Sequence, residues 1–273
     1  MIEIPESVTV AGQATEVLSG KRISEVITAT SPHRFTWYNG DPEKYPALLV
    51  GREIKTVNGY GAFIDILFDS DIHLLIGDGT NMRYCSSDDK APAKFQLLIV
   101  FEDGSFLVFT VAMYGGIYAF RGQFDNPYYQ GSINKLSVPD AGFDESYFEN
   151  MIVSLKKDIS VKALLATEQR IPGLGNGVLQ DILFNARIHP KRKVSTLDDM
   201  AKEKLFHAVK STIAGMIEGG GRNTEKDLFG IWGNYRMILS KNTYKQPCPC
   251  CGSHIVKEAY LGGSVYYCPE CQK

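Results

Sequence analysis

The spacing of apolar residues changes twice along the chain, and the first segment has the spacing of a helix. From Pro5 to Leu18 the apolar residues fall on one helical face. Pro5 suits a first helical turn, Glu6 complements the positive end of the helix dipole, and Gly20 is a typical terminator. We therefore predict a helix from Pro5 to Leu18.

Between Lys21 and about Phe120 the pattern changes to that of strands. Short runs rich in β-branched and aromatic residues are separated by turn residues, and the EDGS sequence at 102–105 is typical of a hairpin connection. The runs are RISEVITA, PALLVGREIKTV, GAFIDILF, IHLLIG, KFQLLIVF and SFLVFTVAMY. Six or more closely spaced strands after one helix predict a β-sandwich or a flattened barrel.

Helical spacing returns after a loop of mixed polarity at 122–137. The predicted helices cover 144–155, 161–168, 177–186 and 196–218. Thr196 is the expected cap of the last one. The fold class is therefore α+β. We expect three parts, which are a helix with a β-sandwich domain at 1–125, a helical domain at 140–240 and a small module at 241–273.

The C-terminal module carries two Cys-x-x-Cys pairs, Cys248 with Cys251 and Cys268 with Cys271. Two tight turns of this kind can place four thiolates tetrahedrally around one ion, which is the arrangement of a closed structural zinc site. Between the pairs, IVKEAY and SVYYC have the composition of strands and are joined by the LGG turn at 261–263. We therefore predict a β-hairpin held by a structural Zn²⁺ ion.

Other uses of the cysteines remain open at this point. Two disulfides are the alternative to zinc, but cysteines in x-x spacing bridge poorly, and the N-terminus has no secretory pattern. Cys250 lies between two predicted ligands and could replace one of them, as could His254. Cys85 has no partner at a metal or disulfide spacing, which fits a reducing compartment.

Composition and charge add an asymmetry to this picture. The hydrophobic fraction of 44% is that of an ordinary globular protein, and no apolar run is long enough to span a bilayer. We therefore expect a soluble, cytoplasmic monomer without a membrane partner. The net charge of −2 combines a net of −9 in residues 1–155 with a net of +7 in residues 156–273. A basic half that carries a zinc hairpin favours contact with nucleic-acid phosphates.

The segment IPGLGN at 171–176 joins two predicted helices and contains a second candidate site. Gly173 and Gly175 allow positive φ and a close approach to another surface. We expect the amides that follow Asn176 to point outward, where the helix dipole favours an anion such as a DNA phosphate. An ordinary turn between helices is the alternative for this motif alone.

Together with the terminal cysteines, this loop resembles the formamidopyrimidine-DNA glycosylase/endonuclease VIII family. The resemblance covers the whole chain and includes, in order, the EIPE start at 3–6, the β-rich half, Lys162, the GLGN loop and the Cys₄ hairpin. It implies a two-domain clamp in which a helix–two-turn–helix element and the zinc hairpin hold double-stranded DNA that is damaged or abasic. Family members excise oxidised bases and cut the abasic site, so the resemblance implies a base-excision-repair glycosylase with AP lyase activity.

The resemblance also assigns roles to individual residues. Glu3 matches the family's catalytic glutamate, which assists opening of the sugar ring and proton transfer. Asn176 matches the asparagine that holds the phosphate beside the lesion, and Gly173 and Gly175 belong to the same DNA-binding loop. Lys162 matches a lysine near the lesion-side backbone. The four paired cysteines match the zinc ligands.

The nucleophile position departs from the family pattern. The resemblance implies a reaction in which the amine of an N-terminal proline attacks the sugar C1′ and forms an imine. Here that position is Ile2. Because an initiator Met is removed efficiently only before small residues, we expect Met1 to carry the free amine, up to ~3.8 Å further out. Met1 and Ile2 are therefore candidate catalytic residues with Glu3, although a displacement of about 1 Å can cost ~100-fold in rate.

Four further positions differ from the family. The β-domain lysine expected within 57–63 is missing, and the residue expected to fill the gap left by a flipped base is Asp78, an anion that would face the DNA. The expected wedge into the opposite strand contains Met113 and Tyr114, and the hairpin's phosphate-binding arginine is replaced by Gly263.

These departures leave three hypotheses. The first is a divergent glycosylase and lyase that uses the Met1 or Ile2 amine with Glu3. The second is a catalytically inactive DNA-binding member of the family, and the third is a zinc-stapled protein that no longer binds DNA. The EIPE start favours the first, because a pure binding module has no chemical need for Glu3. Near the glycine-rich turn at 219–221, Arg222 and Lys226 are candidate phosphate contacts, and Trp232 either stacks on a base or packs against the hairpin.

Overall fold

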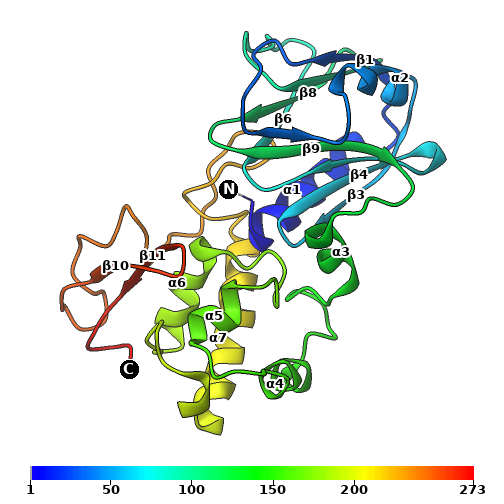
Figure 1. The fold of residues 1–273 in the computed structure, drawn as a ribbon. Coiled ribbons are helices and arrows are strands. Elements are labelled where there is room, and N and C mark those ends of the chain that lie inside the picture. Colours follow the sequence, from blue (N-terminus) through cyan, green and yellow to red (C-terminus); the bar gives the residue numbers. More distant parts are fainter. Residues whose placement is uncertain (1) are drawn as a thin grey trace.

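The computed structural model describes residues 2–273, which form two lobes with a small hairpin module beside the second lobe (Figure 1). The first lobe contains α1 (Ile4–Leu18), α2 (Tyr45–Leu49) and nine strands. The strands are β1 (Ile23–Thr28), β2 (Thr36–Tyr38), β3 (Ile54–Tyr60), β4 (Phe63–Phe68), β5 (Ile72–Ile76), β6 (Thr80–Cys85), β7 (Leu97–Phe101), β8 (Phe106–Val111) and β9 (Gly115–Arg121).

These strands form two sheets that pack as a sandwich. The first sheet has the order β2-β9-β5-β4-β3, in which only the β2–β9 pair is parallel, and the second has the order β1-β7-β8-β6. Residues such as Ile66 of β4, Ile99 of β7 and Phe109 of β8 belong to one buried core. The predicted sandwich and the α+β class are therefore confirmed, and the two separate sheets exclude a closed barrel.

Several boundaries within this lobe were predicted wrongly. PALLV, expected to begin a strand, forms the short helix α2, with Pro46 in its first turn. The strands β2, β6 and β9 were not predicted. The expected loop at 122–137 contains a helix, α3 (Pro127–Asn134), whose N-cap Asn126 accepts hydrogen bonds from the amides of Tyr128 and Tyr129.

The second lobe is helical. It contains α4 (Glu145–Val153), α5 (Val161–Ala166), α6 (Asn176–Asn185) and α7 (Asp199–Glu218). The last helix starts later than predicted, because Asp198 rather than Thr196 accepts the capping hydrogen bond, from the amide of Ala201. The hairpin module follows, with β10 (Val256–Tyr260) pairing antiparallel to β11 (Gly263–Tyr267).

Helix α1 connects the two lobes and starts between them (Figure 1). Its residues Val10, Ala14 and Leu18 are buried in the sandwich core. Ile4, one turn earlier, is fully buried in the core of the helical lobe. A third apolar cluster, which includes Phe184 of α6 and Tyr266 of β11, attaches the hairpin to the helical lobe. The division into 1–125, 140–240 and 241–273 stays a prediction.

Candidate functional site

The four paired cysteines lie together at the base of the hairpin. The sulfurs of Cys248 and Cys271 are 3.8 Å apart, those of Cys251 and Cys268 are 3.5 Å apart, and all four lie within 4.8 Å of one another. A tetrahedral zinc site with Zn–S bonds of ~2.3 Å has sulfur–sulfur edges of about 3.8 Å, so the donor set fits this ion. The cysteines are free thiols, so the disulfide alternative is wrong.

The other candidate ligands lie outside this cluster. Cys250 is exposed, and its sulfur accepts a hydrogen bond from Arg187 Nη2 at 3.2 Å. His254 is exposed as well. Backbone hydrogen bonds shape the two cysteine turns, from the amide of Gly252 to the Cys248 carbonyl and from the amide of Gln272 to the Cys268 carbonyl. The turns that position the sulfurs are thus formed by the chain itself.

Glu3 is buried where α1 meets the helix–loop–helix segment of the second lobe. Its Oε1 accepts a hydrogen bond from the amide of Gly177 at 2.9 Å, and its Oε2 accepts one from Val178 at 2.8 Å. These are the first amides of α6, so the carboxylate lies at the positive end of that helix. The prediction that these amides point outward to bind a phosphate is therefore wrong. The anion that they bind is the Glu3 carboxylate of the protein itself.

Gly173 and Gly175 allow this close approach between the lobes. Gly173 has φ +77°, and a Cβ there would lie 2.1 Å from the backbone of Gly61 in the β3–β4 turn. A Cβ on Gly175 would lie 2.6 Å from the Glu3 carboxyl group. The surface that both glycines approach is the protein's own first lobe, and their contact with DNA stays a prediction.

Arg222 completes a buried charge cluster around Glu3. Its Nε and Nη2 lie 2.9 and 2.6 Å from the two oxygens of Glu6, and its Nη1 lies 3.4 Å from Glu3 Oε1. Although burial opposes its charge, the Glu3 and Glu6 carboxylates raise the pKa of Arg222. With only 3% of its surface exposed, Arg222 is not the phosphate contact that the sequence suggested.

Lys162 and Asn176, the other two predicted DNA ligands, both bind the hairpin backbone. Lys162 is buried and donates to the Tyr260 carbonyl at 2.6 Å, and burial lowers its pKa. Asn176 Nδ2 donates to the Ser264 carbonyl at 2.8 Å, whereas its buried Oδ1 has no partner within residues 2–273. A Cβ on Gly263 would lie 3.3 Å from the Asn176 side chain. Both side chains hold the hairpin against the helical lobe, and their contact with a phosphate stays a prediction.

A pocket of about 490 Å³ opens in front of Glu3, between the lobes. Its lining includes Ile2, Asp78, Asn176 and Arg222. Glu3, Ile2, Gly173, Gly175 and Asn176 thus share one cavity, whereas Lys162 and the cysteines lie away from it. Met1, the other candidate nucleophile, lies outside the described residues. Asp78, expected as an anion facing DNA, is half-buried in this pocket, and burial raises its pKa to about 6.

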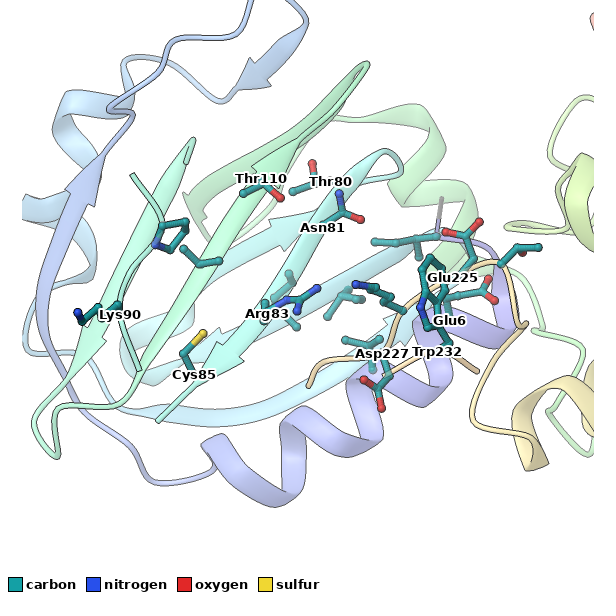
Figure 2. A pocket seen from close by; sticks show the side chains of 18 residues that line it. Glu6, Thr80, Asn81, Arg83, Cys85, Lys90, Thr110, Glu225, Asp227 and Trp232 are labelled. Carbon is teal, nitrogen blue, oxygen red and sulfur yellow. The ribbon is translucent and has the colours of Figure 1, made fainter. Parts of the chain in front are cut away.

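A second pocket of about 560 Å³ adjoins the first along β6 and β8. Figure 2 shows Asn81, Arg83 and Thr110 along the strands, with Glu225 and Trp232 at the other end. Trp232 is 55% exposed, and the Lys226 ammonium lies 4.9 Å from the centre of its ring. The alternative in which Trp232 is buried against the hairpin is therefore wrong, and its stacking on a base stays a prediction.

Two buried groups that position the site were not found from the sequence. The first is the Glu6–Arg222 pair described above. The second is Asp181 of α6, which is fully buried and accepts hydrogen bonds at 2.8 Å from the amides of Ile238 and Leu239, where the chain turns toward the hairpin. Burial raises the pKa of Asp181 to about 6. A carboxylate inside the apolar sequence VLQDILF was the available signal.

Comparison with known proteins agrees with the two-lobed fold and the cysteine cluster. Residues 138–227 match the family model described as Formamidopyrimidine-DNA glycosylase H2TH domain. The formamidopyrimidine-DNA glycosylases of Brevibacillus brevis and Cytobacillus firmus are 28% and 27% identical, and each alignment covers 100% of this chain and at least 99% of the relative.

Solved structures have the same architecture. The MutM (Fpg) protein of Thermus thermophilus is 23% identical, with a TM-score of 0.81 over 99% of this chain and 98% of that one. The Lactococcus lactis Fpg in complex with abasic-site DNA is 22% identical, with a TM-score of 0.82 over 99% of both chains. The fold is thus that of a two-lobed protein with a helix–two-turn–helix element and a Cys₄ hairpin.

The chain belongs to the formamidopyrimidine-DNA glycosylase/endonuclease VIII family. This membership confirms the resemblance recognised in the sequence. No described helix combines the length and the apolar character needed to cross a membrane.

Proposed function

We propose that this protein is a DNA repair enzyme that removes damaged bases from duplex DNA and cleaves the resulting abasic site. The observation that carries this proposal is the position of Glu3, whose carboxylate is fixed by two amides of α6 at a pocket between the lobes. A carboxylate that served only to cap α6 would not need to line a pocket. The relatives named formamidopyrimidine-DNA glycosylase, and the Lactococcus lactis structure with abasic-site DNA, support the same substrate.

DNA would lie across the basic second half of the chain. Residues 156–273 carry 18 Lys and Arg against 11 Asp and Glu, which favours the phosphate backbone on that side. We assign the loop residues Gly173, Gly175 and Asn176, together with Lys162, to this interface. A zinc ion held by Cys248, Cys251, Cys268 and Cys271 would keep the hairpin beside them, a structural contribution rather than a catalytic one.

The chemistry requires a free amine beside Glu3. Ile2 is buried in the sandwich core and also lines the pocket. Its packing therefore holds the backbone just before Glu3 at the cavity. We assign the nucleophile to the amine at the start of the chain, carried by Met1 or, after its removal, by Ile2. An uncharged amine can attack C1′ of the sugar and form an imine. Intact-mass measurement identifies which residue carries the amine.

Borohydride trapping on duplex DNA with one abasic site tests the proposal. The reductant converts an imine into a stable covalent adduct, which migrates as a protein–DNA complex on a denaturing gel. We expect an adduct with the wild-type protein and its loss in Glu3→Gln. Glu16→Gln, an exposed position on the same helix, is the matched control and should trap normally. Wild-type protein that binds abasic DNA but forms no adduct would contradict the enzymatic assignment.

An inactive DNA-binding protein is the second candidate, because Ile2 replaces the proline expected at the nucleophile position and is buried. That function predicts salt-sensitive binding to abasic duplex without any adduct. Failure to bind any duplex at low salt would exclude both candidates and leave only a zinc-stapled protein without a DNA partner.

A further inference from the structure

A groove of about 720 Å³ lies in the helical lobe, outside the cavity in front of Glu3. It runs between α4 and the loop that joins α5 to α6, and Figure 1 shows α4 on the side of the lobe away from the hairpin module. Neither the proposed reaction nor the predicted DNA contacts use this groove. Its lining combines an apolar floor with a basic rim.

The floor consists of half-buried side chains from α4 and the segment after it, Tyr147, Met151, Leu155 and Ile159. All four pack against the core of the helical lobe and still leave apolar surface toward the groove. Val153 of the same helix is 76% exposed, although valine is usually buried. Apolar surface that stays exposed over several neighbouring residues commonly marks a contact with another molecule.

The charged residues that line the rim are mostly basic. They are the cations Lys135, Lys156, Lys157 and Arg170 and one acid, Glu168. Lys135 already donates to a backbone carbonyl of the α5–α6 loop, and Arg170 is paired with Glu168. Lys156 and Lys157 are exposed, and neither makes a hydrogen bond or an ion pair within residues 2–273. Two ammonium groups on this rim can therefore receive an anionic ligand.

The α5–α6 loop lies between the groove and the cavity. Gln169 lines the cavity, whereas its neighbours Glu168 and Arg170 line the groove. Glu168 and Gln169 have φ of +56° and +48°, in the left-handed region that residues other than glycine rarely adopt. Lys135 binds the Gln169 carbonyl at 2.6 Å, and Arg170 Nη1 donates to two carbonyls at the end of α5. These contacts hold the loop, so a ligand in the groove would leave the cavity open.

A protein segment fits this groove better than a nucleic acid does. A phosphate backbone would use the two unpaired lysines but leave the apolar floor uncovered. An acidic peptide with a large apolar side chain would use both, because the floor removes the apolar group from water and the rim attracts the carboxylates. The net charge of +7 in residues 156–273 adds to this attraction.

We propose that the groove between α4 and the α5–α6 loop is a docking site for an acidic segment of another protein, one that carries leucine or phenylalanine beside its carboxylates. The partner would be held on the helical lobe while the cavity remains free for DNA. Docking does not depend on the reaction proposed above, because the groove and the cavity share no lining residue.

Fluorescence anisotropy with two labelled peptides and the intact protein tests this proposal. One peptide has four aspartates followed by leucine and phenylalanine, and in the other two serines replace the apolar pair. We expect the first peptide to bind with a Kd on the order of 10 µM, as for a small transient interface, and the second to bind at least about 10-fold more weakly. Equal binding of the two peptides, or no binding up to about 1 mM, would overturn the proposal.

Two double variants locate the binding on the protein. Lys156→Glu combined with Lys157→Glu should weaken binding of the apolar peptide at least about 10-fold, because two attractive charges become repulsive. Lys94→Glu combined with Lys204→Glu makes the same change in net charge at exposed positions outside the groove and should bind normally. All four lysines are exposed, so equal melting temperatures are expected. Wild-type affinity in the first double variant would overturn the proposal.

Two other occupants of the groove give distinct outcomes. Unlabelled abasic duplex should not displace the peptide, because the groove lies outside the cavity, and displacement would mean that DNA fills the groove. A dimer in analytical ultracentrifugation that dissociates in the Lys156→Glu and Lys157→Glu double variant would mean that the acidic lobe of a second copy fills it. Either result would overturn the assignment to another protein.

Discussion

Removing the Arg222 guanidinium should destabilise the protein strongly and in a pH-dependent manner. In Arg222→Met, Glu6 loses two close contacts, at 2.9 and 2.6 Å, and Glu3 loses one at 3.4 Å. The exposed fraction is only 3% for the Arg222 side chain and 6% for each glutamate side chain. Breaking a buried pair by removing one partner costs about 3–5 kcal/mol, because the remaining charge has no counter-ion. For a chain of this length that loss corresponds to a fall in Tm on the order of 10 °C.

The sign of the pH dependence follows from the two glutamates left behind. Without the guanidinium, the two carboxylates are buried charges that have no counter-ion, and the cost of burying them applies only while they are ionised. Protonation at low pH removes that cost, so the variant loses stability relative to wild type as the pH rises. We therefore expect a larger stability loss at pH 8 than at pH 5.

Urea unfolding followed by tryptophan fluorescence at pH 5 and pH 8 measures both effects. Glu6→Leu combined with Arg222→Met removes most of the buried charge and should recover part of the stability lost in the single variant. Trapping should fall in Arg222→Met, since Glu3 is no longer held on that side. A loss below about 1 kcal/mol, or an equal loss at both pH values, would refute the idea that these carboxylates depend on Arg222 for their charge balance.

Three further predictions concern the hairpin and the α5–α6 loop. Cys268→Ser should release the metal detected by atomic absorption and lower both Tm and DNA affinity, whereas Cys250→Ser should retain one Zn²⁺ per chain, because Cys250 lies outside the sulfur cluster. Gly175→Ala should displace the Glu3 carboxyl, from which its Cβ would lie 2.6 Å, and abolish trapping, whereas Gly131→Ala in α3, with open space around it, should leave trapping intact and Tm equal or higher. Gly263→Arg should strengthen DNA binding and steepen its salt dependence by about one unit in log–log slope, as measured by fluorescence anisotropy; an unchanged slope would show that the hairpin tip does not reach a phosphate.

The parts of the fold that could be predicted from sequence are those whose patterns are local. Helix α1 has a continuous apolar face, and the strands β4, β5, β7 and β8 are runs of mostly apolar residues. Both patterns can be recognised in the sequence without knowledge of the partners. In contrast, β6 presents Asn81 and Arg83 outward and contains few β-branched residues, so its strand character comes from pairing with β8. Strand β9 begins with two glycines and is stabilised by β5 and β2. Helix α3 contains Gly131 and ends at Asn134, residues that locally favour a loop.

The candidate site shows the same division. The cysteine cluster was predictable because four identical donors at fixed spacing have one common geometry. Glu3 could be named as a candidate from the EIPE motif, but its partners could not, since the amides of Gly177 and Val178 lie more than 170 positions away in sequence. For the same reason Arg222 was predicted to bind phosphate. Its position opposite two buried glutamates arises only when α1 enters the space between the lobes.

The shared position of α1 also constrains how the protein can be made. Ile4 belongs to an apolar cluster whose other buried members lie between residues 138 and 237. The first turn of α1 can therefore reach its native burial only after those residues have been synthesised. Until then, the part of the chain that brings Ile2 and Glu3 to the cavity has only half of its final packing partners.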